Sequence, residues 1–158
     1  MDEHSDAYWL GMAVDLAAQN VTVGGGPFGA VIVRDGALVA VGQNRVTVDL
    51  DPTAHAEVHA IRVAVTVLGD VSLTGCILYA SCEPCPMCLA ASLWARLDRV
   101  VYAADRYDAA AAGFDDQAFY DLFNTDRSQW DVGVEMIVLP HRLLPFDRWR
   151  VQGRRVEY

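Results

Sequence analysis

Apolar positions in the first third of the chain change their period, and the change predicts a helix followed by a β-hairpin. In residues 6–20 apolar side chains recur every three or four positions, as on one face of an amphipathic helix. Residues 28–34 and 37–44 are largely apolar runs of strand length. Asp35 and Gly36 lie between these runs and supply the positive φ angles of a tight hairpin turn.

After a polar loop at residues 45–53, the pattern alternates between helices and strands. The expected helices begin at residue 52 or 53, 84, 115 and 145, and the first three end near residues 68, 96 and 123. The expected strands cover residues 76–81, 99–104 and 134–139. Residues 105–113 are expected to form a loop, although their alanine run could be helical. This order predicts an α/β fold, a three-layer α/β/α sandwich whose mixed five-stranded sheet carries helices on both faces.

Length, charge and hydropathy narrow the class of protein. A chain of 158 residues is expected to form a single domain, residues 1–158. No apolar run approaches the roughly 20 residues that span a bilayer, and the acidic N-terminus lacks the features of a secretory signal. We therefore expect a cytoplasmic protein without a membrane partner. The net charge of −9 argues against nucleic-acid binding, and the arginines near the C-terminus are expected to form a solvated helix face.

The cysteines carry the first chemical signal. Three of the four fall within seven residues, at positions 82, 85 and 88, and in a chain without an export signal this clustering favours a metal or redox role over disulfides. Cys85 and Cys88 are three residues apart and therefore face the same way on one helix. His55 also begins a predicted helix. Two thiolates and one imidazole leave a tetrahedral Zn²⁺ with one open position, as catalytic zinc sites require.

Glu57 lies two residues after His55, a spacing that constrains the geometry of the site. Residues two apart on a regular helix point about 200° away from each other. The two side chains can therefore serve one site only if that site lies over the end of the helix. There Glu57 would act as a general acid/base beside the metal, and it would not be a ligand.

These residues also fit other kinds of site. A C-x-x-C pair alone also fits a structural zinc site, with Cys82 as a fourth ligand, or a redox pair. Cys76 is expected to be a core thiol of a strand. His59 lies one turn after His55, and we favour a packing role for it over ligation. The combination of H-x-E with P-C-x-x-C is the signature of zinc deaminases and favours a catalytic site.

These motifs resemble those of the cytidine deaminase-like superfamily of zinc-dependent deaminases. Four segments and the C-terminal tripeptide narrow the resemblance to bacterial guanine deaminases of this fold: residues 25–33, 52–57, 81–88, 112–116 and 156–158. The resemblance implies hydrolysis of guanine to xanthine and ammonia, with one Zn²⁺ per chain held by His55, Cys85 and Cys88. A zinc-bound hydroxide would attack C2 of the base, and Glu57 would shuttle the protons.

The resemblance also implies further roles for particular residues. Asp116 would be a second proton shuttle at the amino group. The other implied contacts to the base or its pocket are Asn44, Phe28, Trp94 and Tyr158. Related enzymes form a homodimer that exchanges a C-terminal segment, here about residues 140–158, so that Tyr158 closes the partner's site. The implied partner is thus a small nucleobase and a second copy of the chain.

Two positions depart from the family pattern, and two rival functions follow from the same motifs. His59 and Arg45 look atypical and could alter the substrate preference. One rival is a deaminase of the same fold that acts on cytosine, guanosine, an s-triazine or a tRNA adenosine. The other rival is a non-catalytic zinc-binding module. Glu57 favours catalysis, because a site without chemistry has no need of a proton carrier.

Overall fold

A four-stranded mixed sheet forms the centre of the protein in this computed structural model, which describes residues 5–156. The strand order is β2-β1-β3-β4. The strands span Gly29–Arg34 (β1), Ala37–Gln43 (β2), Cys76–Cys82 (β3) and Arg99–Ala104 (β4). β1 is antiparallel to both β2 and β3, whereas β3 and β4 are parallel.

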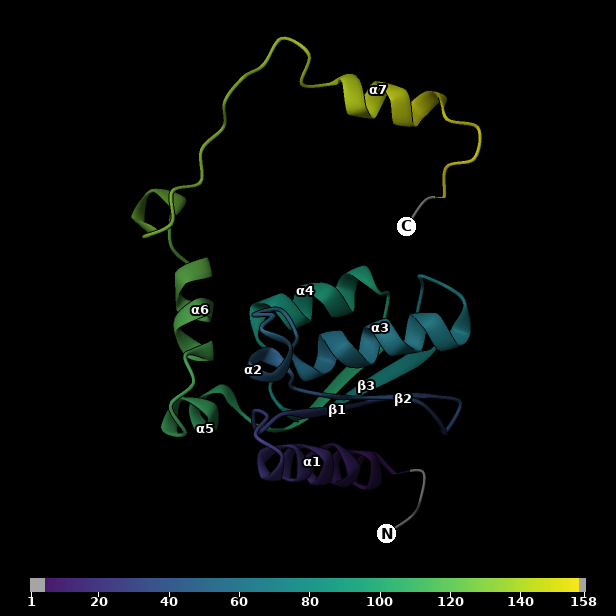
Figure 1. Cartoon of the computed structure of the whole chain (residues 1–158), viewed down its shortest axis with the longest axis vertical. Coiled ribbons are helices and arrows are strands. Elements are labelled where there is room, and N and C mark those ends of the chain that lie inside the picture. The colour runs from purple at the N-terminus through teal and green to yellow at the C-terminus, as the bar shows by residue number, and fades with distance from the viewer. Residues whose placement is uncertain (1–4, 157–158) are drawn as a thin grey trace.

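Helices cover both faces of this sheet, which confirms the predicted α/β/α layering (Figure 1). α1 lies against one face, and α3 and α4 lie on the other face, while α5 and α6 stand beside the sheet. The helices span Asp6–Thr22 (α1), Val46–Asp49 (α2), Ala56–Leu68 (α3), Pro86–Trp94 (α4), Arg106–Ala111 (α5), Asp116–Phe123 (α6) and Leu144–Val151 (α7). A 3-10 turn covers Arg127–Gln129.

The alternation of side chains along the central strands divides the core between the two layers. Val31 and Val33 of β1 point to the α1 side, where they pack with Trp9. Ala30 and Ile32 point to the opposite side and pack with the alanines of α3. Both faces of β1 are therefore buried, which explains why its sequence is a continuous apolar run.

Two glycines allow helices to approach the sheet closely. A Cβ atom at Gly42 would lie 2.0 Å from the carbonyl oxygen of Ala56 in the first turn of α3. A Cβ atom at Gly29 would lie 2.4 Å from the carbonyl oxygen of Ala13 in α1. Because β-carbons do not approach backbone atoms so closely, these positions require glycine. Gly42 in particular fixes how near the start of α3 lies to the sheet.

The hairpin turn is confirmed, and three predicted segments differ from the structure. Asp35 and Gly36 adopt φ angles of 51° and 72°. The sheet has four strands and not five, because among residues 5–156 no strand pairs with residues 134–139. The polar loop at residues 45–53 contains α2, and the alanine run of residues 105–113 forms α5. An Asp105–Asp108 capping box explains the last outcome, since it satisfies the free N–H groups at the start of α5.

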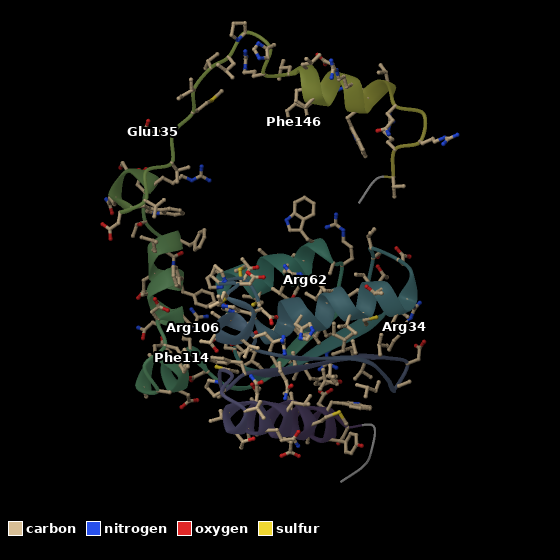
Figure 2. The ribbon with its side chains drawn as sticks, viewed as in Figure 1. Arg34, Arg62, Arg106, Phe114, Glu135 and Phe146 are labelled. Carbon is tan, nitrogen blue, oxygen red and sulfur yellow. The ribbon has the colours of Figure 1, made fainter. Side chains whose placement is uncertain are left out.

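The chain after α6 leaves the body and ends in α7, which lies apart from the sheet (Figure 1). We call residues 131–156 the C-terminal arm. Every residue of this arm is exposed, including strongly apolar side chains such as Met136 (76%) and Ile137 (80%). Figure 2 shows Phe146 on α7, remote from the body of the molecule. Within residues 5–156, no helix has the length and apolar character needed to cross a membrane.

Candidate active site

The starts of α3 and α4 bring three metal-binding side chains together. His55 is the N-cap of α3, and Cys85 is the N-cap of α4. The His55 Nδ1 atom lies 3.6 Å from Cys85 Sγ and 3.5 Å from Cys88 Sγ, and all three donor atoms lie within 4.8 Å of one another. Two sulfurs and one imidazole nitrogen in a tight triangle suit Zn²⁺, which prefers such a donor set.

The two thiols of this triangle differ in acidity. Hydrogen bonds from Cys88 and from His55 hold the pKa of Cys85 well below its usual range. The same Cys85–Cys88 hydrogen bond and burial raise the pKa of Cys88. The pKa of His55 is raised, first because it shares a hydrogen bond with Cys85. A cation among these three donors would favour the second thiolate as well.

Glu57 lies in the first turn of α3, directly beside the triangle. Its side chain is buried, with only 7% of the residue exposed, and its Oε2 accepts a hydrogen bond from Cys88 Sγ at 3.4 Å. Burial raises the pKa of this carboxyl group. The site therefore lies over the end of α3, as the two-residue spacing from His55 predicts, and Glu57 can take up a proton at that point.

Asp116 begins α6 and lies near enough to the triangle to interact electrostatically with Cys85 and His55. Burial and the nearby charge of Cys85 raise the pKa of its carboxyl group. The charge of Asp116 in turn contributes to the raised pKa of His55, after the Cys85 hydrogen bond. Two carboxyl groups with raised pKa values thus border the metal-binding triangle, an arrangement suited to proton transfer.

Asn44 and Phe28 lie side by side next to the glycine-rich turn. The backbone N–H of Asn44 donates to the carbonyl of Phe28 at 3.1 Å. The buried amide of Asn20 joins this pair to the turn, since its Nδ2 donates to the carbonyl of Asn44 at 2.7 Å and to that of Gly26 at 2.8 Å. The Phe28 ring packs edge-on against Phe114, with 4.8 Å between centroids.

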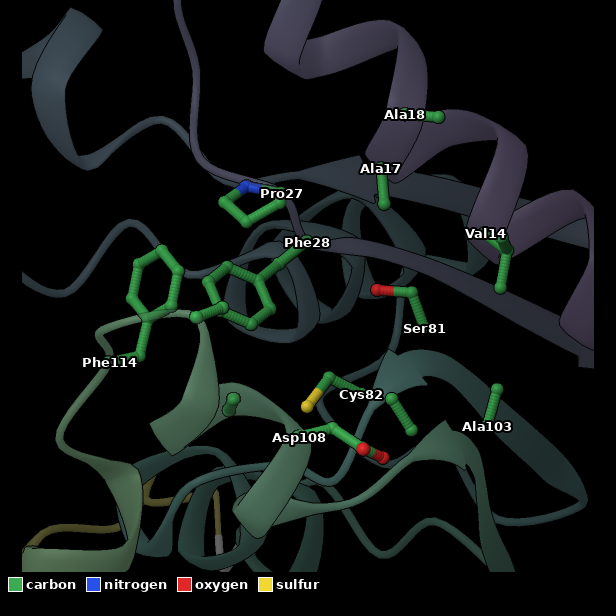
Figure 3. Close-up of a pocket in the computed structure, with 13 residues that line it drawn as sticks. Val14, Ala17, Ala18, Pro27, Phe28, Ser81, Cys82, Ala103, Asp108 and Phe114 are labelled. Carbon is green, nitrogen blue, oxygen red and sulfur yellow. The ribbon is translucent and has the colours of Figure 1, made fainter.

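An apolar pocket of about 400 Å³ lies between α1, α5 and the ends of β3 and β4 (Figure 3). Phe28 and Phe114 close one end of this pocket, and Cys82 and Ser81 line its floor. The three metal-binding side chains do not line it. The pocket is therefore not the metal site itself.

Other residues highlighted by the sequence lie away from the triangle. Cys82 Sγ donates to the carbonyl of Asp105 and lies outside the donor cluster, and Cys76 is a buried core thiol. Trp94 ends α4 with 64% of its surface exposed, six residues and about 9 Å of helix beyond Cys88. Tyr158 lies outside the described residues.

The two atypical positions lie in different elements: Arg45 is the N-cap of α2, and His59 lies in α3. The Arg45 guanidinium pairs with Asp49 in an exposed ion pair. His59 does not join the donor cluster, and its Nδ1 is buried without a hydrogen-bond partner within residues 5–156. Neither side chain therefore contributes to the metal-binding triangle.

Comparison with known proteins decides the family. The sequence model of the cytidine and deoxycytidylate deaminase zinc-binding region matches residues 3–104, which include every residue of the triangle and Glu57. The chain belongs to this family. Its zinc-binding character agrees with the donor set, so His55, Cys85 and Cys88 are the residues that would hold one Zn²⁺.

Particular members of this deaminase family resemble the whole chain. The guanine deaminase of Bacillus subtilis is 52% identical over 151 residues, which cover 95% of this chain and 97% of that protein. Its solved structure aligns over 98% of this chain and 99% of that one, with a TM-score of 0.93. A guanine deaminase from Nitrosomonas europaea is 33% identical and aligns over 73% of this chain and 65% of that one, with a TM-score of 0.67.

Matches to deaminases with other substrates are shorter. The tRNA-specific adenosine deaminase of Aquifex aeolicus is 39% identical over 97 residues, which cover 61% of this chain and 64% of that protein.

Sequence reasoning missed four residues that support the site. They are the bridging amide Asn20 and an ionic and aromatic cluster behind the cysteine motif, Glu83, Arg106 and Tyr120. Glu83 lies inside the cysteine motif, and Tyr120 lies one helical turn after Asp116. These positions are the sequence signals that could have identified Glu83 and Tyr120.

Proposed function

We propose that this protein hydrolyses guanine to xanthine and ammonia. The observation that carries the proposal is the buried Glu57 carboxyl beside a Cys₂His triangle, which provides a proton carrier at an open metal position. The near full-length similarity to the Bacillus subtilis guanine deaminase supports guanine over the other bases.

Glu57 performs the proton transfers in this proposal. Bound zinc supplies an acidified water as the source of the attacking oxygen. The Glu57 carboxylate takes up the proton of that water and delivers it to a ring nitrogen of guanine beside C2. The raised pKa of Glu57 suits both steps. A carboxyl group exchanges protons most efficiently when its pKa lies near the working pH.

Asp116 and the residues near the glycine turn complete the proposed site. Asp116 accepts hydrogen bonds from the amino group of the base, takes up the proton of the hydroxyl group added at C2 and passes it to the amino group, which leaves as ammonia; its raised pKa suits this role. Asn44 provides a directional amide at the edge of the base, and Phe28 provides an aromatic wall. Trp94 and Tyr158 would close the base-binding site only within the dimer, because Trp94 is exposed in the single chain.

A tRNA adenosine deaminase is the main alternative with the same metal chemistry. Such an enzyme must bind many phosphates, and the net charge of −9 opposes that. Glu57 argues against a non-catalytic zinc module. Burying its carboxyl group costs stability, and a module without chemistry would gain nothing in return.

We also propose that residues 1–158 form one catalytic domain whose C-terminal arm is exchanged in a homodimer. Exposed apolar side chains along the arm support an external partner for it. Residues 134–139 form no strand, and the β4 edge of the sheet is free among the described strands, so this segment could pair with the edge of a second copy. Free cysteines throughout the described chain support a reducing, cytoplasmic location.

Two measurements test the catalytic proposal. Metal analysis of the purified protein should give about one zinc per chain. Ammonia release should then be measured with guanine, guanosine, adenine, cytosine and ammeline at matched concentrations. Guanine is expected to be the best substrate, and preferential turnover of any other member of this panel would overturn the assignment.

A further inference from the structure

An ion pair beneath the cysteine motif connects the metal-binding loop to α5. The Glu83 carboxylate lies directly before Pro84 and Cys85, and it accepts hydrogen bonds from the Arg106 backbone N–H and Nε, each at 3.0 Å, as well as from Nη2. The side chains are only 10% and 27% exposed, respectively. The Arg106 hydrogen bonds hold the pKa of Glu83 below its usual range.

The same arginine also contacts α6. Its Cζ lies 3.4 Å from the centre of the Tyr120 ring, so the guanidinium uses its edge for Glu83 and its face for Tyr120. The Tyr120 hydroxyl then donates to the carbonyl of Pro84 at 2.5 Å. Arg106 and Tyr120 thus join α5 and α6 to the two residues that precede Cys85. Figure 2 shows Arg106 beside α5 and α6, on the side of the body that carries Phe114.

This connection matters because α6 has few other fixed contacts. All eight residues of α6 are described, and none of them is buried. Asp116 and Tyr120 are four residues apart on this helix and therefore lie on the same face. A contact that fixes Tyr120 against Pro84 consequently also fixes the distance of Asp116 from Cys85 and His55.

We propose that Arg106 is a positioning residue for Asp116: by binding Glu83 and Tyr120 together, it holds the start of α6 over the metal-binding triangle. This inference deepens the proposed function, since it rests on Asp116 acting in that site. Lysine cannot replace the arginine, because an ammonium group is a point donor without the flat face that stacks on Tyr120.

The test is a double-mutant cycle between Arg106→Lys and Asp116→Asn. In the Asp116 background, Arg106→Lys should lower kcat by about 10–100-fold, as for other residues that orient an active-site group, with zinc content unchanged. In the Asp116→Asn background, the same substitution should change kcat by less than about twofold, because the group that it positions is absent. Equal losses in both backgrounds, or wild-type kcat in Arg106→Lys, would overturn the inference.

Two further readouts separate positioning from general stability. Amide hydrogen exchange should rise in residues 116–123 of Arg106→Lys and stay unchanged in α3, and unchanged exchange in α6 would contradict the inference. The absorption spectrum of the Co²⁺-loaded protein should stay the same, because the three metal ligands do not move. A shifted spectrum would mean that the loss of kcat arises at the metal site and not at Asp116.

Matched variants control for folding and for the choice of substrate. Arg99→Lys alters another arginine that donates two hydrogen bonds to one carboxylate, that of Asp6 at the start of α1, and it should leave kcat unchanged. Should Arg106→Lys fold poorly, Tyr120→Phe removes only the hydroxyl bond to Pro84 and should give a smaller loss that is again absent with Asp116→Asn. The cycle uses whichever base the wild-type protein turns over best, so a failure of guanine as substrate leaves this test intact.

Discussion

At the scale of single residues, Glu57 combines burial with the proposed proton transfer. Its carboxyl group has been moved out of water into contact with Cys88, and burial raises its pKa. Burial of this kind opposes stability unless the group is paired or hydrogen-bonded. The sequence spacing from His55 was enough to predict where this side chain lies, because only one geometry satisfies it.

Glu57→Gln should abolish most turnover while zinc stays bound. The amide keeps the shape of the side chain but cannot accept and return a proton, so kcat should fall by about 10²–10⁴-fold. Ammonia release and metal content, measured on the same sample, check this. Asp15→Asn, an exposed change on α1, serves as the control, and turnover near the wild-type rate in Glu57→Gln would disprove the proton-carrier role.

Cys82→Ser and Cys88→Ser should separate ligand from non-ligand within one motif. Cys88 lies in the donor triangle, whereas the Cys82 thiol donates to the carbonyl of Asp105 and lines the apolar pocket. Zinc content should therefore fall sharply in Cys88→Ser and stay near one per chain in Cys82→Ser. Loss of zinc in Cys82→Ser would instead favour a structural site with four protein ligands.

At the scale of elements, the start of α3 depends on its close approach to β2. Gly42→Ala should lower the free energy of unfolding by about 1–3 kcal/mol, because the added methyl group meets backbone atoms of Ala56 and Ala60. Activity should fall as well, since the displaced turn carries Glu57. Thermal unfolding and ammonia release measure the two effects.

Gly11→Ala is the matched control for this substitution. Gly11 lies within α1, and a Cβ atom there would meet nothing within 4 Å. Alanine favours helix over glycine by up to about 1 kcal/mol, so this variant should be unchanged or more stable. A destabilised Gly11→Ala beside a stable Gly42→Ala would contradict the packing account.

The elements that the sequence predicted best are those whose signal is local. The Asp35-Gly36 turn and the strand at residues 99–104 follow from short patterns. The two helices at the metal-binding triangle were also predicted, but from residues 52 or 53 and 84, whereas they begin at Ala56 and Pro86. The predicted strand at residues 134–139 was wrong for this chain, because an extended apolar segment becomes a strand only when another strand pairs with it. The Arg106 contacts were equally invisible, since they join residues 23 and 14 positions away.

At the scale of the whole molecule, charge is divided between the body and the end of the chain. Residues 1–130 hold seven arginines and seventeen acidic residues, whereas the C-terminal arm, residues 131–156, holds five arginines and three acidic residues. A basic, apolar arm and an acidic body attract each other, both within one chain and between copies. The arm leaves its own body in this structure, which favours binding between copies (Figure 1).

Exchange of the arm predicts complementation between two inactive chains. One chain carries Glu57→Gln and an intact arm, and the other lacks residues 156–158 but has an intact metal site. If the arm of one chain closes the site of its partner, each mixed dimer contains one complete site, because the intact arm reaches the intact Glu57. Co-expressed and co-purified pairs should then recover activity well above either parent, to roughly a quarter of the wild-type rate for random pairing of equal amounts. If each arm closed its own site, the mixture would show no more than the sum of its parents, and sedimentation of each sample verifies that dimers are present.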